Sequence, residues 1–148
     1  MFFVRIFKSR KILNVCNVEI LLTLSDKEFD SFRSIKYLKN LGNLSSSEMN
    51  NYYKKVDALL FLSSIESYGL PLIEAMASNL PILTVDLSYS RWVCDEQAYF
   101  FKPYDEESFY NALSNLMREY ESGKLPDYTQ VLKKFPKSWA DVVGAFLI

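Results

Sequence analysis

The chain has 148 residues, of which 49% are apolar and 24% charged, and this composition fits a single globular domain with a core of its own. Its 17 basic side chains nearly balance its 18 acidic ones, so no overall charge favours nucleic acid as a partner. The sequence contains no histidine, which removes the commonest general base and the commonest metal ligand.

Two further features bear on where the chain works. Cys16 and Cys94 are far apart and in no paired spacing, so we expect neither a disulfide framework nor a zinc site and a reduced, cytoplasmic location. No segment approaches the roughly 20 apolar residues of a membrane span, although peripheral contact with the inner face of a membrane stays open. We expect one domain over residues 1–148.

The first segment, residues 1–7, is apolar but too short and too soon charged for a signal peptide. It predicts an edge strand or the first strand of a sheet. A shortened helix is expected over 11–17, which makes residues 1–17 an irregular start. Later short apolar runs predict strands at 18–24, 35–41, 58–62, 81–85 and 98–101.

Helical patterns separate these strands. Ser45 and Glu48 form a capping box that begins a helix burying Met49, Tyr52 and Tyr53. Further helices are expected over 71–78, 106–121, 129–135 and 138–147, and the helix over 106–121 has the clearest apolar periodicity. The alternation predicts an α/β fold, a Rossmann-like doubly wound parallel sheet flanked by helices.

The loop after residues 58–62 carries the chemistry. Gly69 allows a tight turn and close backbone approach, and Pro71 suits the first turn of a helix. The N–H groups of that turn predict a phosphate site. Glu74, one turn into the helix, is placed to accept hydrogen bonds from a ribose diol, and Glu66 on the loop faces the rest of the ligand. Either glutamate alone would be an ordinary solvated residue.

The full run E-S-Y-G-L-P-L-I-E-A-M-A, from Glu66 to residue 77, resembles the E-x7-E motif of family 4 glycosyltransferases. The flanking runs N-L-G-N-L-S-S-S-E-M and A-Y-F-F-K-P-Y-D-E-E-S are similar to the same family. The resemblance covers about residues 17–121. It implies one half of a two-domain GT-B fold, namely the C-terminal, donor-binding half, in a retaining enzyme of capsule or O-antigen synthesis.

The resemblance also implies roles for individual residues. Glu66 would be the catalytic carboxylate near the transferred sugar, and Glu74 would hold the ribose of the donor nucleotide. The remaining donor-binding positions are Ser67, Tyr68, Gly69 and Leu70 for sugar and phosphate, Asn43 and Leu44 for the base, and Arg10 and Lys11 for the diphosphate. The family is metal-independent and uses a nucleotide diphosphate sugar as donor substrate, so no cofactor is expected.

The chain departs from the family pattern in three places. We expect the acceptor domain to be missing from these 148 residues, so that activity needs that N-terminal domain in cis or in trans. The first 17 residues are irregular, which favours an alternative, an inactive truncated remnant or interaction module of the same fold. Trp92 replaces a Glu that is common in the family.

Two interpretations stay open for Tyr89, Arg91 and Trp92. They line the cleft in one and pack structurally in the other. A third interpretation of the whole chain is an unrelated nucleotide-binding regulatory domain.

Overall fold

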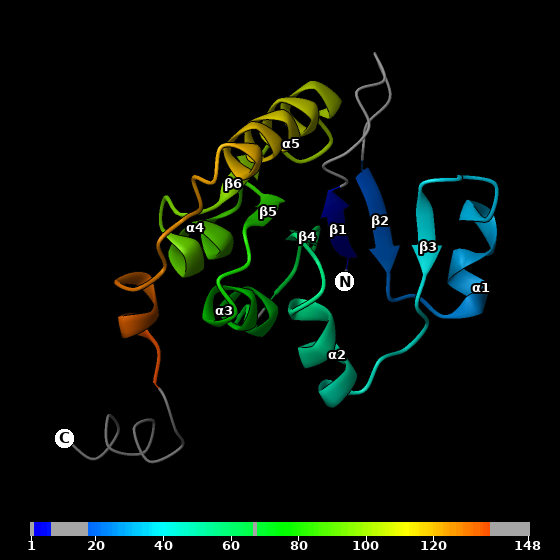
Figure 1. Cartoon of the computed structure of the whole chain (residues 1–148), viewed down its shortest axis with the longest axis horizontal. Helices are drawn as coiled ribbons and strands as arrows, with labels where there is room; N and C mark the ends of the chain where they lie inside the picture. The colour runs from blue at the N-terminus through cyan, green and yellow to red at the C-terminus, as the bar shows by residue number, and fades with distance from the viewer. Residues whose placement is uncertain (1, 7–17, 67, 137–148) are drawn as a thin grey trace.

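The computed structural model describes residues 2–6, 18–66 and 68–136 (Figure 1). In these residues one six-stranded sheet has the strand order β3-β2-β1-β4-β5-β6. Its strands are β1 (Phe2–Ile6), β2 (Val18–Leu22), β3 (Leu38–Asn40), β4 (Ala58–Phe61), β5 (Ile82–Val85) and β6 (Tyr99–Phe101). The helices are α1 (Asp26–Phe29), α2 (Ser46–Tyr53), α3 (Leu70–Ala77), α4 (Ser88–Cys94) and α5 (Glu106–Glu121), with 3-10 turns η1 (Asp30–Phe32) and η2 (Val131–Lys134).

β1 lies in the middle of the sheet and runs antiparallel to both of its neighbours. Phe2 pairs with Leu22 of β2 and with Leu60 of β4, so β2 and β4 run the same way. β3 is parallel to β2, and β5 and β6 are parallel to β4. The carboxyl ends of all five of these strands therefore meet at one edge of the sheet, where a ligand would sit in an α/β fold.

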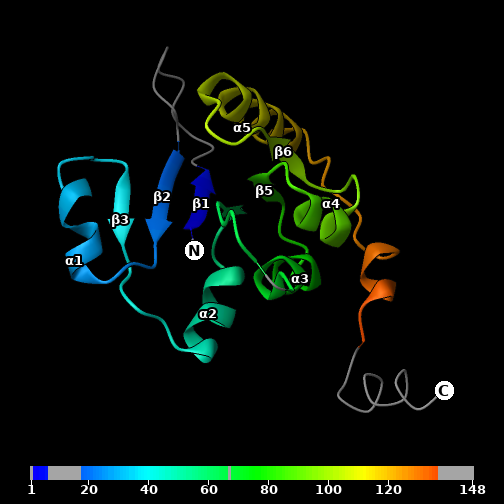
Figure 2. The same cartoon turned by 180° about the vertical axis from the view of Figure 1, so that it is seen from behind.

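Helices cover both faces of the sheet (Figures 1 and 2). One buried cluster joins α2, α3, α4 and the segment around η2 to the sheet through Leu21, Leu59, Phe61 and Ile82. A second cluster packs α5 against the opposite face through Ala58, Leu60, Leu83, Val85 and Phe101. Alternate residues of β4 belong to opposite clusters, as expected for a strand buried on both sides.

The predicted fold class is confirmed, with β1 as the exception. A parallel strand needs a long crossover connection, and only residues 7–17 separate β1 from β2. The strand was predicted at an edge or as the first of the sheet, and it is the first in the chain but central in the sheet. A helical period does not distinguish a 3-10 turn from one α-helical turn, so the helix predicted over 129–135 is the 3-10 turn η2.

Two predicted helices begin at the residues expected to cap them. α5 spans Glu106–Glu121 with Asp105 as its N-cap, and α2 begins at the capping box of Ser45 and Glu48. α1, η1 and α4 are not among the helices expected from the sequence. The helices expected over 11–17 and 138–147 lie outside the described residues. Within the described residues, no helix has both the length and the apolar character that crossing a membrane requires.

Candidate functional site

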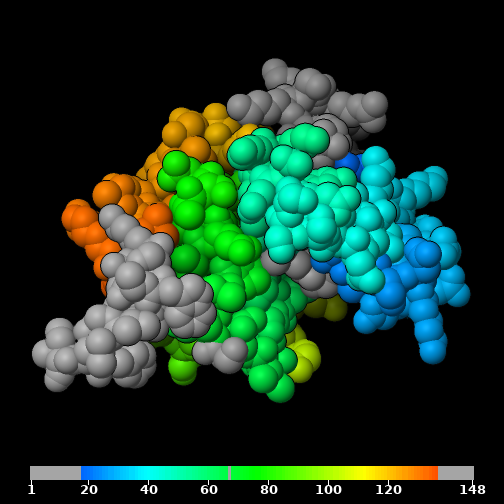
Figure 3. Space-filling model, turned by 90° about the horizontal axis from the view of Figure 1, so that it is seen from below, coloured from blue at the N-terminus to red at the C-terminus, as the bar shows by residue number. Residues whose placement is uncertain are grey.

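The loops that follow β3, β4 and β5 all open at the carboxyl edge of the sheet. Figure 3 looks at the molecule from below, where the β2 and β3 arrows of Figure 1 point, and the teal atoms of α2 lie beside the green atoms of the segment that follows it. The loop between β4 and α3, residues 62–69, includes Glu66 and leads into the helix that carries Glu74. The predicted carboxylates thus flank the beginning of α3.

The beginning of α3 depends on Gly69. Gly69 is the N-cap residue and has a left-handed backbone with φ of 73°, which glycine adopts at little cost. A β carbon here would lie 3.1 Å from Cγ2 of Val93 on α4. The position therefore requires glycine for its backbone angle and for its close packing against a neighbouring helix.

The backbone donors at this end of α3 are fewer than the sequence suggested. Pro71 has no N–H, and the N–H groups of Leu72 and Ile73 donate to the carbonyl of Gly69 at 2.9 and 3.2 Å. The N–H groups of Gly69 and Leu70 come before the first helical hydrogen bond. These two groups, with the helix dipole behind them, are the donors that an anion would meet.

Glu66 is half-buried on the loop. Its Oε1 accepts a long hydrogen bond of 3.5 Å from the N–H of Tyr68. The hydroxyl of Tyr89, from α4, donates to the carbonyl of Ser63 and so ties the loop to α4. Burial raises the pKa of Tyr89, and the negative charge of Glu66 adds to the rise.

Glu74 lies in the middle of α3 with its side chain exposed. Its Oε2 accepts a hydrogen bond of 2.9 Å from the hydroxyl of Tyr53, the last residue of α2. Tyr53 itself is 3% exposed. The pKa of Tyr53 is raised well above its usual value, chiefly by burial and then by the charge of Glu74, so the phenol stays protonated and remains a donor.

The predicted base loop lies just before α2. Gly42 turns the chain with φ of 70°. Asn43 is exposed, and Leu44 packs partly against the buried cluster that joins α2, α3 and α4 to the sheet. α2 therefore connects the Asn43–Leu44 loop at its beginning to the Tyr53–Glu74 contact at its end. The structure places the two predicted parts of a nucleoside site at opposite ends of one short helix.

Apolar side chains surround the β4–α3 loop. Tyr68 is 41% and Leu70 58% exposed. The ring of Phe135 meets both Tyr68 and Trp92 edge-on, with ring centroids 6.3 and 5.7 Å apart. Trp92 keeps 57% of its surface exposed, so it packs on one side and faces solvent on the other.

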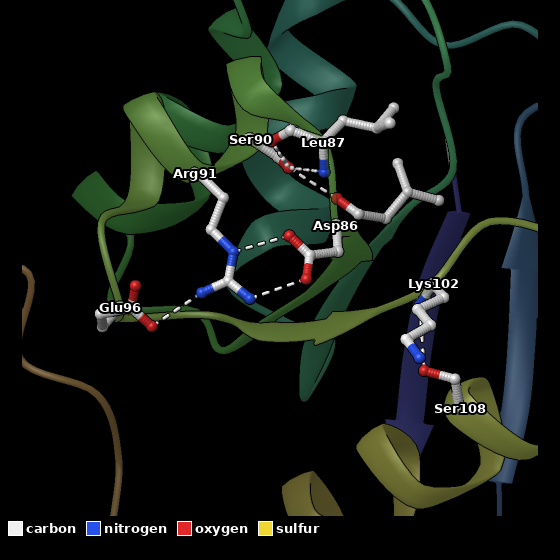
Figure 4. Close-up of polar contacts among 8 residues, drawn as sticks. Asp86, Leu87, Ser90, Arg91, Glu96, Lys102 and Ser108 are labelled. Atoms are coloured by element: carbon white, nitrogen blue, oxygen red, sulfur yellow. Dashed lines mark hydrogen bonds and ion pairs between the residues drawn. The ribbon is translucent and has the colours of Figure 1, made fainter.

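Arg91 forms ion pairs with acidic side chains of the domain, which supports the structural interpretation of this residue over a place in the cleft (Figure 4). Its guanidinium donates to Asp86 at 2.7 and 2.8 Å and to Glu96 at 2.7 Å, and it lies 3.8 Å from the ring centre of Phe100. The pKa of Asp86 is lowered, mainly by the hydrogen bond from Arg91. Asp86 follows β5 directly, so this ion pair fixes the entry to α4.

Three predicted site residues, Ser67, Arg10 and Lys11, lie outside the described residues. Among residues 2–6, 18–66 and 68–136, no group of three or more acidic or cysteine side chains could hold a metal ion. Tyr53 was predicted only as a core residue, and its link to Glu74 was missed. A buried tyrosine needs a partner for its hydroxyl, but a separation of 21 positions in the sequence forms no local pattern that could reveal this pair.

Comparison with known proteins places the chain among sugar transferases. Residues 31–130 match the family described as glycosyl transferases group 1. The chain is 37% identical over 76 residues to the O-antigen chain mannosyltransferase RfbU of Salmonella typhimurium, which covers 51% of the chain and 22% of the relative. It is 30% identical over 86 residues to the serotype-specific mannosyltransferase WbdA of Escherichia coli, covering 58% of the chain and 11% of that relative.

The chain thus spans about a fifth or less of the length of these curated relatives. Among solved structures, it is similar to the pneumococcal O-GlcNAc transferase GtfA, crystallised with UDP and GlcNAc, at a TM-score of 0.51 and 18% identity. That likeness covers 82% of this chain and 26% of the other. At such low identity it shows a shared fold, that of a GT-B glycosyltransferase domain.

Proposed function

The chain belongs to the glycosyl transferases group 1 family, and we propose that it is the C-terminal, donor-binding half of a retaining transferase of family 4. Its substrate is a nucleotide diphosphate sugar used in the synthesis of capsule or O-antigen polysaccharide. The observation that carries this proposal is the arrangement at α3. Glu66 and Glu74 flank the beginning of this helix, which has a left-handed glycine as its N-cap, and a buried tyrosine donates to the second carboxylate.

Each group at this helix has a chemical role in the proposal. Glu74 accepts hydrogen bonds from the ribose hydroxyls, and Glu66 contacts the transferred sugar near the reacting carbon. The N–H groups of Gly69 and Leu70 hold phosphate and sugar oxygens, with support from the helix dipole. Ser67 and Tyr68 complete this part of the donor site.

The rest of the donor site comes from other loops. Asn43 and Leu44, before α2, lie against the base. Arg10 and Lys11 neutralise the diphosphate, which is already negatively charged in the donor and gains a further negative charge as the sugar leaves. We propose that transfer needs no metal, as in the family that the E-x7-E motif resembles. The bond between sugar and diphosphate breaks, the acceptor hydroxyl attacks the same face, and the leaving phosphate takes the proton of the acceptor.

Transfer needs a second domain in this proposal. The N-terminal acceptor domain, in the same chain or in another, closes over the carboxyl edge of the sheet and brings the acceptor. Alone, the described domain binds the donor and transfers nothing. We propose a cytoplasmic site of action, with peripheral membrane contact made through the acceptor domain.

A calorimetric titration tests the proposal with UDP, GDP and ADP and with the mannose or glucose conjugate of each. We expect saturable binding of one nucleotide and a loss of about tenfold in affinity for Glu74→Gln, since a hydrogen bond to a charged acceptor is removed. Glu121→Gln, an exposed substitution at the end of α5, is the matched control and should bind normally.

Three results would contradict the proposal. Absence of binding to every nucleotide by a chain shown to be folded would favour an inactive remnant of the same fold. Binding that Glu74→Gln leaves unchanged would place the nucleotide elsewhere. Tight selection of a base without any contribution from the sugar would instead favour a regulatory nucleotide-binding domain.

A further inference from the structure

The hydrogen bond between Tyr53 and Glu74 joins a buried donor to an exposed acceptor. Tyr53 is 3% exposed and packs in the cluster that joins α2, α3 and α4 to the sheet. A tyrosine ring held in this way has one orientation, so its hydroxyl oxygen occupies a fixed point. The atom it contacts at 2.9 Å, Oε2 of Glu74, belongs to a side chain that solvent would otherwise leave free to move.

An unrestrained glutamate on an exposed helix face samples several rotamers. Fixing such a side chain when a ligand binds costs conformational entropy, which weakens binding. A hydrogen bond that fixes the side chain beforehand removes part of that cost. Tyr53 can do this for Glu74 because its own position is set by the core and not by the ligand.

The hydrogen bond also leaves Glu74 able to act as an acceptor. An ionised carboxylate offers about four lone-pair positions on its two oxygens, and the hydroxyl of Tyr53 uses one of them, on Oε2. The remaining positions can take two hydroxyls of a vicinal diol. The contact therefore orients the carboxylate without consuming its binding capacity.

We propose that Tyr53 is a positioning residue that holds the Glu74 carboxylate in place for the ribose hydroxyls of the donor nucleotide. The inference rests on the proposed function, because it assigns the ribose to Glu74. It adds that the ribose subsite is built from α2 as well as α3. Since α2 also follows the Asn43–Leu44 loop, a single helix sets the base and ribose positions relative to one another.

Tyr53→Phe tests this role because it keeps the ring and removes the hydroxyl. The matched control is Tyr99→Phe. Tyr99 donates a similar hydrogen bond of 2.8 Å to Oε2 of Glu119, between β6 and α5 and away from the site. Both variants lose one tyrosine–glutamate hydrogen bond, so they should lose comparable thermal stability. Only the first should affect the nucleotide.

The measurement is calorimetric affinity for UDP, GDP and ADP and for their 2′-deoxy forms. We expect Tyr53→Phe to bind the preferred ribonucleotide about threefold to tenfold more weakly, the effect of one hydrogen bond, and to bind its 2′-deoxy form with a smaller loss. Tyr99→Phe should match the unmodified protein for both. Combined with Glu74→Gln, Tyr53→Phe should add little, since both act through one carboxylate.

Three results would overturn the inference. If the unmodified protein binds none of these nucleotides, the proposed function fails and the inference fails with it. If it binds and Glu74→Gln weakens binding, but Tyr53→Phe behaves like Tyr99→Phe, only the positioning role is wrong. Equal losses for ribonucleotide and 2′-deoxynucleotide in Tyr53→Phe would show a general disturbance of the site and no specific role at the ribose.

Discussion

Arg91 holds the carboxylate of Asp86 by two parallel hydrogen bonds, from Nε to Oδ1 at 2.7 Å and from Nη2 to Oδ2 at 2.8 Å. The two residues join the end of β5 to α4, the helix whose Tyr89 fixes the β4–α3 loop. Two bonds in one plane give this pair a defined geometry that single contacts lack. The pair therefore supports the candidate site from the neighbouring strand.

The first prediction concerns Asp86→Asn and pH. The folded state lowers the pKa of Asp86, so the pair stabilises the fold above the unfolded-state pKa, and this contribution is lost as the pH falls through the folded-state pKa. Both side chains are 37% exposed, and solvent screening limits the loss at pH 7 to about 0.5–1 kcal/mol. Urea unfolding at several pH values should show the difference from the unmodified protein shrinking below about pH 4.

Asp30→Asn is the control for this experiment. Asp30 forms a single 2.7 Å contact with Arg33, and both side chains are more than half exposed, so its removal should have a smaller effect. A difference between Asp86→Asn and the unmodified protein that persists unchanged at pH 3 would contradict the assignment to charge pairing.

The second prediction is that Gly69→Ala is more damaging than Gly42→Ala. Both glycines have left-handed φ angles, 73° and 70°, but only at Gly69 would the new methyl group meet a neighbour, 3.1 Å away on Val93. The backbone strain costs about 1 kcal/mol at each position. We expect the contact to add about 1 kcal/mol at Gly69, measured by urea unfolding. Equal losses would show that α4 yields without cost.

The third prediction concerns the beginning of α2. Ser45 accepts from the N–H of Glu48, whose carboxylate accepts in turn from the N–H of Ser45 at 2.8 Å. Ser45→Ala should destabilise the protein by about 1 kcal/mol, the usual effect of losing such a cap. Ser46→Ala, one residue further on, should be neutral or slightly stabilising because alanine favours helix interiors. Thermal unfolding of the two variants checks the pair, and identical melting temperatures would exclude the cap as a source of stability.

The fourth prediction concerns Cys94, which is buried as a free thiol in the cluster that joins α2, α3 and α4 to the sheet. Burial raises its pKa to about 12, so almost no reactive thiolate exists near neutral pH. Iodoacetamide should leave Cys94 unmodified in the folded protein and modify it readily in concentrated urea, as measured by mass spectrometry of its peptide. Rapid modification without urea would show that α4 opens locally at low cost.

Much of the fold follows from local patterns. β4 and β5 are buried at every position, and such short apolar runs predict central strands. α5 has the predicted bounds because Asp105 caps it and its apolar residues keep a helical period. The direction of β1 could not be predicted in the same way, since it depends on which strands β1 pairs with and not on its own residues.

The candidate site was predicted only in part for a similar reason. Gly69 and the two glutamates lie within nine consecutive positions, where turn and helix rules apply. The contacts of Glu74 with Tyr53 and of Ser63 with Tyr89 span 21 and 26 positions. The ion pair of Arg91 with Asp86 was not predicted, because the spacing of the two residues does not mark an ion pair. Such tertiary contacts depend on how the elements pack, and they produce no repeating pattern in the sequence.

The central position of β1 has a consequence for the order of folding. The sheet contains two parallel units, β2 with β3 and β4 with β5 and β6. Within the sheet of the described residues, β1 is the strand that is hydrogen-bonded to both units. Residues 2–4 of β1 pair with residues 58–60. The six-stranded sheet therefore cannot be completed until the ribosome has synthesised β4. Pairings so distant in sequence form slowly. A nascent chain that has reached only β3 would carry an open strand edge, which invites association with other chains.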